Sequence, residues 1–253
     1  MDVNLIRARM NLFAVLQNLE DLVALDSEMT KFTRSWNLSI QFSVLNGPSA
    51  FLEFKQGSCK HGAGKHPNPT VRLLFLSPAH VNKMFDGKGS PIPLKGFSKL
   101  GFLQKDFAKL TGRLEYFLKP AKGQVQDETY RKINTTLSLY TAAYAVRELA
   151  LLEPTCKQLA NATPNGVLMI HVLPDGPAVH LTVEKGLFAV GKGVHAHPTA
   201  KMTFKDLKAA NDLLGGRLDV SLAVSEQSLM LSGVLPVIEN TTMILDRVEK
   251  YLA

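Results

Sequence analysis

The chain has 253 residues, of which 45% are hydrophobic and 20% are charged, a composition typical of soluble globular proteins. No apolar run reaches the roughly 20 residues that a transmembrane helix needs, which argues against a membrane-spanning protein. Two cysteines, Cys59 and Cys156, are too few for a disulfide-stabilised secreted scaffold, so we expect a cytoplasmic protein.

The formal net charge of +7 is distributed unevenly along the chain. Between Lys55 and Lys122 there are 13 basic residues and only 3 acidic ones. This excess is either a solvated face or a surface that attracts an anionic partner, such as a membrane or an acidic protein. Nucleic acid is the least expected partner, because no exposed aromatic residues alternate with the basic ones at a known spacing.

The first predicted elements are a helix followed by strands. Apolar residues at helical spacing predict an amphipathic helix within residues 1–25. From Trp36 to Val44 apolar and polar residues alternate, which predicts a half-buried strand ending at Asn46-Gly47. Asn-Gly favours the positive φ angles of a tight hairpin turn. A returning strand, a turn at Gly57 and two more short strands, the last over 71–76, complete a predicted four-stranded meander.

Two helices and a linker follow. One helix is predicted to begin at Ser77 and to end near Gly87. An amphipathic closing helix extends from Leu100 to Phe117, and we expect one more short strand before it. Residues 120–126 contain proline, glycine and polar residues, a composition typical of a linker.

The second half of the chain has the same order of elements. A helix over 127–153 is predicted to end at Pro154. Strands follow on either side of Asp175-Gly176, then a turn at Gly186, a strand over 200–204 and a helix from Asp206 to Gly216. A second amphipathic closing helix is predicted from Val237 to Leu252.

The two halves are also related in sequence, at a spacing of 129 residues. Residues 47–89 have 12 identities with residues 176–218 in 43 positions aligned without a gap, including His66 with His195 and Asn82 with Asn211. Gly96 matches Gly233 only if the first copy lacks eight residues. The period is a whole domain, longer than solenoid repeats of roughly 20–50 residues. We therefore expect two related domains, residues 1–122 and 127–253, of the α+β class.

Three segments of the second unit form a recognisable pattern together with the amphipathic C-terminal helix: 198–207, 213–219 and 229–233. In these segments the second unit resembles the sterol carrier protein-2 (sterol-binding) domain family. They match the family in an alternating strand, an acidic helix start, a glycine-plus-basic turn and a strand that ends in glycine. The resemblance covers residues 165–252 well and residues 36–118 weakly, through the repeat.

The resemblance implies two tandem sterol-carrier-like domains, each a mainly antiparallel sheet of about five strands covered by helices. It also implies an apolar tunnel for a lipid, a sterol-like molecule or another hydrophobic ligand. We place that ligand in the second domain, against Phe204, Leu214, Ile238, Thr241, Ile244, Leu245 and Val248. The first copy lacks the segment where the family has a short helix, and its many phenylalanines could have filled its cavity.

The leading hypothesis is therefore a non-enzymatic binding or carrier protein, without catalytic residues, metal or cofactor. The repeated histidines, His66 and His195, are interpreted as turn residues that cap backbone groups, because no acidic or cysteine ligand lies at a metal-site spacing. Known nucleophile and zinc motifs are absent from the sequence. The alternative is an accessory or scaffold protein whose basic first domain docks on an anionic membrane or an acidic protein.

Overall fold

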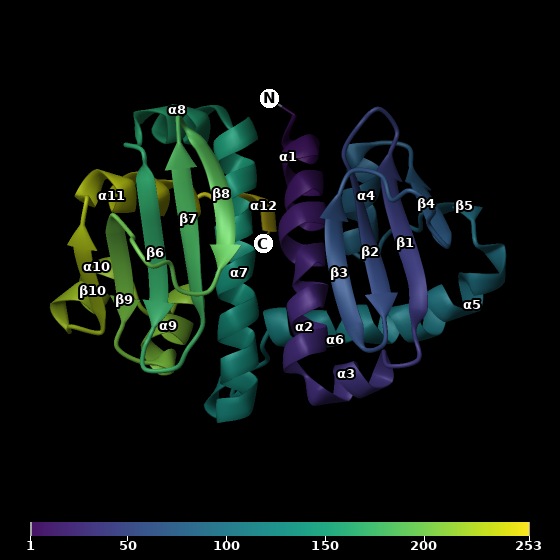
Figure 1. Ribbon diagram of the computed structural model, residues 1–253, viewed down its shortest axis with the longest axis horizontal. Coiled ribbons are helices and arrows are strands. Elements are labelled where there is room, and N and C mark those ends of the chain that lie inside the picture. The colour runs from purple at the N-terminus through teal and green to yellow at the C-terminus, as the bar shows by residue number, and fades with distance from the viewer. Residues whose placement is uncertain (1, 253) are drawn as a thin grey trace. The chain divides into compact units, whose positions relative to one another are not determined.

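The computed structural model describes residues 2–252, and all of these except Leu252 divide into two compact, continuous units, Asp2–Lys119 and Pro120–Tyr251 (Figure 1). We call them the N-terminal and the C-terminal domain. Each contains one five-stranded mixed sheet together with helices, so the predicted α+β fold class is confirmed. No helix among residues 2–252 is long and apolar enough to cross a membrane.

The N-terminal domain begins with a helical segment in which a π-helical turn (Asn11–Val15) and a 3-10 turn (Leu16–Asn18) join two α-helices. Its α-helices are α1 (Val3–Met10), α2 (Leu19–Leu25), α3 (Ser27–Phe32), α4 (Pro78–Phe85), α5 (Leu100–Phe102) and α6 (Ala108–Leu118). Its strands are β1 (Asn37–Val44), β2 (Ser49–Lys55), β3 (Ser58–Ala63), β4 (Val71–Phe75) and β5 (Ile92–Lys95).

The C-terminal domain repeats this arrangement around one long helix. Its α-helices are α7 (Glu128–Leu152), α8 (Pro154–Ala162), α9 (Leu207–Leu214), α10 (Val220–Ser225), α11 (Leu235–Leu245) and α12 (Glu249–Leu252). Its strands are β6 (Gly166–Val172), β7 (Ala178–Glu184), β8 (Leu187–Lys192), β9 (Ala200–Phe204) and β10 (Leu229–Gly233). Asp127 caps the start of α7, and Pro154 occupies the first turn of α8.

The two sheets have the same strand order, β3-β2-β1-β4-β5 and β8-β7-β6-β9-β10. The predicted four-stranded meander is wrong in one respect: β4 pairs with β1, in parallel, and not with β3. The same holds for β9 and β6. Strand β1 is buried at nearly every position, and a buried strand needs a hydrogen-bonded neighbour on each side. The crossover to β4 supplies the second neighbour.

The tight turns confirm only part of the predicted geometry. The chain reverses direction at both Asn46-Gly47 and Asp175-Gly176, but only Asn46 among these four residues takes a positive φ. Both residues are in the left-handed region at Gln56-Gly57 and at Lys185-Gly186 instead. Those two-residue turns match the twist of their strands, as type I′ turns do.

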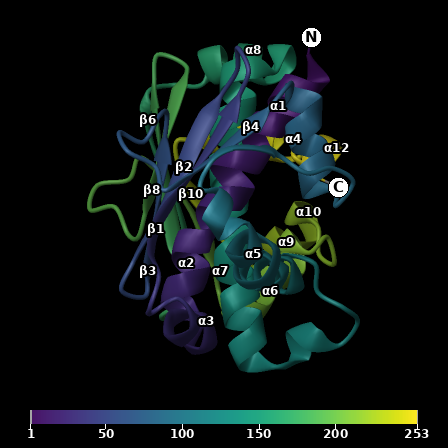
Figure 2. The same cartoon turned by 90° about the vertical axis from the view of Figure 1, so that its right-hand side faces the viewer.

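One face of each sheet carries the apolar residues that pack under helices of the same domain, and Figure 2 shows this layering of helix on sheet within each domain. In β1 this face presents Ile40, Phe42 and Val44, all buried. In the C-terminal domain α11 packs on β6, β9 and β10, while α7 packs on β7 and β8. The predicted alternation of apolar and polar residues therefore describes which side of each sheet is covered.

The two domains differ between their fourth and fifth strands, as the sequence predicted. The C-terminal domain has α10 between α9 and β10, whereas the N-terminal domain passes from α4 to β5 without a helix. After these strands Gly96 and Gly233 both adopt positive φ, 85° and 91°. A Cβ at either glycine would collide with a backbone carbonyl oxygen, that of Thr70 or of Thr199. The two glycines are thus structural equivalents.

Candidate functional site

The residues predicted to hold an apolar ligand lie mostly on α11 and on the strand beneath it. Ile238, Thr241 and Ile244 on α11 are buried, as is Phe204 at the end of β9. Leu245, at the end of α11, is half-buried, and so are Val248, just beyond α11, and Leu214, at the end of α9. Since α11 packs on β9, these four buried side chains lie in one layer of the domain, between the helix and the sheet.

The equivalent layer of the N-terminal domain is filled with aromatic rings. Trp36 lies 5.0 Å from Phe54 and 4.7 Å from Phe102, measured between ring centroids. Phe107 lies 6.4 Å from both Phe42 and Phe54. These spacings are those of favourable edge-to-face or tilted aromatic pairs. The rings pack the space between the sheet and the closing helix of this domain.

The strand registers identify the C-terminal counterparts of two of these rings. Phe42 pairs with Ala50 and Leu73, and Ile170 pairs with Val179 and Met202, which lie 129 residues after Ala50 and Leu73. Ile170 itself lies 128 residues after Phe42, so it is the counterpart of Phe42 by strand register. By the same comparison, Phe54 on β2 corresponds to Val183 on β7. Two large aromatic side chains are therefore replaced by smaller aliphatic ones.

A third ring has a smaller counterpart on the closing helix when the two closing segments are aligned on their arginines. Each closing segment carries an arginine, Arg113 or Arg247, that pairs with a carboxylate of its own domain. Six residues before each arginine stands Phe107 in the N-terminal domain and Thr241 in the C-terminal domain. The Thr241 hydroxyl donates to the carbonyl of Val237 at 2.7 Å, so its hydrogen bond is already made within α11. The side chain thus presents little volume to the sheet.

The carboxylates that hold the closing segments are themselves helix caps. Glu153 accepts from the backbone N–H of Cys156 at 2.7 Å and from Arg247 Nη2 at 2.6 Å. Asp26 does the same in the N-terminal domain, accepting from Glu28 N–H at 2.9 Å and from Arg113 Nε at 2.6 Å. Each buried acid joins the start of a helix to the closing segment of its own domain.

The charge on Glu153 is stabilised by these partners. Burial raises the pKa of Glu153, but the hydrogen bonds from Cys156 and Arg247 outweigh burial and place its pKa below 4.5. Burial, reinforced by the neighbouring Glu153, raises the pKa of the Cys156 thiol to about 12. A thiol with this pKa is protonated at neutral pH, so Cys156 is a structural residue and a poor nucleophile.

The repeated histidines cap turns, as the sequence predicted. The Nδ1 atom of His66 accepts from the backbone N–H of Asn68 at 3.2 Å, and His195 accepts from His197 in the same way at 3.2 Å. Within residues 2–252 there is no group of three or more histidine, cysteine or acidic side chains placed to bind a metal ion.

Two features of the sites were not predicted from the sequence: the Glu153–Arg247 pair and a buried asparagine pair in each domain. Asn11 donates to Asn82 at 3.1 Å, and Asn211 donates to Asn134 at 2.5 Å. The identity of Asn82 with Asn211 in the repeat was the available signal, because a polar residue repeated in two copies needs a common partner. Glu153 directly before a proline is likewise a helix-start signal.

Apolar side chains are exposed beside the candidate ligand layer. They lie on α10, β10 and α11 and in the turn between the last two, at Leu222, Val224, Met230, Val234, Leu235 and Met243, each at least 40% exposed. Helix α10 packs on β10, and β10 packs under α11. The three elements therefore expose apolar side chains at one edge of the C-terminal domain.

No family model matches the chain, and no curated protein matches it either. Among solved structures, a crystal structure of sterol carrier protein 2 is similar at 23% identity over 43% of this chain and 92% of its own, with a TM-score of 0.34. Sterol carrier protein domain 2 of Helicoverpa armigera matches at 14% identity over 45% of this chain and 89% of its own, with a TM-score of 0.35.

A third structure, sterol carrier protein 2 like 2 from Aedes aegypti, matches at 20% identity over 41% of this chain and 92% of its own, with a TM-score of 0.30. Each match takes in less than half of this chain and most of the other one. The resemblance to sterol carrier protein 2 that the sequence predicted is thus found again among solved structures.

Proposed function

We propose that this protein is a non-enzymatic carrier that binds one lipid or other hydrophobic small molecule in its C-terminal domain. The ligand lies between the helix-covered face of the sheet and α11, against Phe204, Ile238, Thr241, Ile244 and Leu245. Leu214 and Val248 border it.

The observation that carries this proposal is the loss of three aromatic rings from one layer. Ile170, Val183 and Thr241 stand where the N-terminal domain has Phe42, Phe54 and Phe107. A layer lined by smaller side chains is where we place the apolar guest, because the volume of the three rings is not taken up there by side chains of the same size. Burying such a guest contributes about 25 cal/mol per Å² of apolar surface.

The exposed apolar edge of α10, β10 and α11 supports a route for entry. A hydrophobic molecule leaving a membrane or micelle would first contact apolar side chains, and this edge offers six of them. The N-terminal domain lacks the segment that forms α10. Its rings and its missing segment together favour a structural role for that domain.

Titration of the full chain with a fluorescent fatty acid tests the stoichiometry. We expect one molecule bound per chain, because only one domain has its rings replaced by smaller side chains. Native mass spectrometry of the purified protein should show the same single adduct, and extraction would identify a ligand retained from the host. Two molecules per chain would contradict the filled N-terminal domain, and no uptake of fatty-acid or sterol probes would refute the carrier.

A second candidate function, docking of the N-terminal domain on an anionic membrane, is favoured by one surface. Around β5 and the turn after it, Ile92, Leu94, Phe97 and Leu100 are exposed, Phe97 at 63%. Exposed lysines stand between and beside them, at Lys88, Lys95, Lys99 and Lys105. Apolar side chains that can enter the headgroup region, next to lysines that attract anionic lipid, are the combination found in membrane-surface proteins.

Phe97→Ser in the full chain tests this surface. Binding of the wild type to vesicles with anionic lipid should fall steeply with added salt, since exposed charges are screened over about 8 Å at physiological ionic strength. Phe97→Ser should weaken that binding several-fold. Leu187→Ser, which removes an equally exposed apolar side chain (64%) from the C-terminal domain, is the matched control and should bind as the wild type does. Salt-independent binding, or equal loss in both variants, would argue against docking through β5.

A further inference from the structure

The C-terminal domain has a polar cavity that the proposed carrier function does not use. Its volume is about 340 Å³, within the range of small-molecule sites. The residues that line it come from the segment before α7, from the first turn of α7, and from α9 and the turn after it. Four of them are cationic and one is acidic: Lys122, Arg131, Lys208, Arg217 and Asp212.

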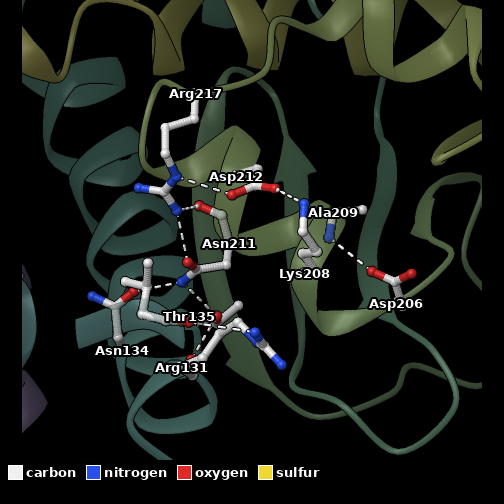
Figure 3. A network of polar contacts seen from close by, with 10 residues as sticks. Arg131, Asn134, Thr135, Asp206, Lys208, Ala209, Asn211, Asp212 and Arg217 are labelled. Carbon is white, nitrogen blue, oxygen red and sulfur yellow. Dashed lines mark hydrogen bonds and ion pairs between the residues drawn. The ribbon is translucent and has the colours of Figure 1, made fainter. Parts of the chain in front are cut away.

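The wall formed by α9 is held by a buried asparagine (Figure 3). Asn211 is 2% exposed, and its amide nitrogen donates to Asn134 Oδ1 at 2.5 Å and to Thr135 Oγ1 at 2.9 Å. Its side-chain oxygen accepts from Arg217 Nη2 at 2.7 Å. Arg217 Nε also donates to Asp212 at 2.9 Å. The guanidinium of Arg217 is therefore fixed in place before any ligand arrives.

The one acidic residue that lines the cavity, Asp212, is already paired with two cations. Asp212 accepts from Lys208 Nζ at 2.7 Å as well as from Arg217. Burial raises its pKa, but these two cations outweigh burial and hold the pKa below its usual value, so the carboxylate is ionised at neutral pH. A single ionised acid among four cations leaves the cavity with a net positive charge.

Arg131 has donor capacity left over. It is the fourth residue of α7, and its Nη1 donates to the carbonyl of Val125 at 3.3 Å. Its Nε is buried without a hydrogen-bond partner. The guanidinium has five N–H donors and the bond to Val125 uses one of them, so donors remain for an incoming anion. Arg131 thus distinguishes this cavity from an ordinary solvated surface.

In the N-terminal domain the corresponding arginine is neutralised by a carboxylate. There the buried asparagine pair recurs as Asn11 and Asn82. The arginine one turn before Asn11, Arg7, makes two hydrogen bonds to Asp86, at 2.6 and 3.1 Å. Arg7 thus has a carboxylate partner within its own domain, whereas Arg131 has none among residues 2–252.

We propose that the cavity between the start of α7 and the end of α9 binds a phosphate group, as a phosphomonoester. A phosphate monoester carries a charge of about −1.5 to −2 at pH 7 and three acceptor oxygens, which suits a site with excess cations and planar guanidinium donors. The cavity is larger than a phosphate alone, so the group is carried on a small molecule or on a lipid headgroup. This site is separate from the apolar layer under α11, and it does not depend on the carrier function.

Titrations of the full chain with glycerol 3-phosphate and with vesicles containing phosphatidic acid test the site. Arg131→Gln should weaken binding by at least about 10-fold, since hydrogen bonds to charged groups contribute enough for that change. Arg7→Gln, in the N-terminal domain, is the matched control and should leave binding unchanged. Should Arg131→Gln unfold, as circular dichroism would show, Lys122→Gln at an exposed position should weaken binding about fivefold.

The two probes separate the sources of the phosphate. Binding of glycerol 3-phosphate identifies a soluble phosphomonoester, and binding of phosphatidic acid alone identifies a lipid headgroup; either result supports the site if Arg131→Gln weakens it. The proposal fails if the wild type binds neither probe. It also fails if Arg7→Gln and Arg131→Gln weaken binding equally, or if phosphatidylserine vesicles bind as well as phosphatidic acid, since net charge alone would then explain the binding.

Discussion

Thr241→Phe is expected to reduce the uptake of a fatty-acid probe by at least about 10-fold, since each methylene denied burial costs roughly 0.8 kcal/mol. The change installs on α11 the ring that Phe107 supplies in the N-terminal domain. That ring would occupy the layer between α11 and the sheet, where we place the ligand. A probe titration of the folded variant, compared with the wild type, measures the effect.

The same helix offers a control for this substitution. Glu239 is exposed on α11 and does not belong to the apolar edge, so Glu239→Phe adds a ring on the outer side and should leave uptake unchanged. Overpacking by Thr241→Phe is expected to lower the free energy of unfolding by about 1–3 kcal/mol, which a denaturant titration would detect. Ile244→Trp and Leu245→Trp fill the same layer and should also block uptake. If all three folded variants took up the probe normally, the proposed position of the ligand beneath α11 would be wrong.

Glu153→Ala is expected to lower the free energy of unfolding by about 3 kcal/mol, the lower end for a broken buried ion pair because Arg247 is partly exposed. The substitution removes the acceptor for Arg247 and the N-terminal cap of α8 in one step. Urea unfolding at pH 7 measures the loss. Glu239→Ala, at an exposed position on α11, is the control and should change stability by less than about 0.5 kcal/mol.

The loss in Glu153→Ala should depend on pH in a defined direction. The pKa of Glu153 is lowered in the folded chain, so its charge stabilises the fold above the ordinary carboxyl pKa of 4.5. That contribution disappears as the pH falls through the still lower folded pKa. The stability difference between wild type and variant should be constant near neutral pH and shrink below about pH 4.5. A difference that does not shrink in acid would show that the carboxylate charge contributes nothing to the pair.

The sequence by itself determined the elements and their repetition. Alternating residues from Trp36 to Val44 predicted β1, because successive side chains of a strand point to opposite faces. Pro154 marked the end of α7 since proline cannot continue a helix interior, and it also starts α8. The gap before Gly96 correctly located the missing counterpart of α10. These signals are local, so a single chain carries them without knowledge of its partners.

The tertiary structure alone decided which strands and side chains meet. The parallel pairing of β1 with β4 depends on burial at both edges of β1, and strand periodicity says nothing about neighbours. Glu153 meets Arg247 across 94 residues, and Asn134 meets Asn211 across 77. The repeat in the sequence already aligns Phe54 with Val183. Only the strand registers of the structure show that both side chains line the layer under a closing helix. Contacts of this kind are set by packing between elements that are distant in the sequence. The sequence therefore could not predict the cavity lined by Arg131 and Arg217.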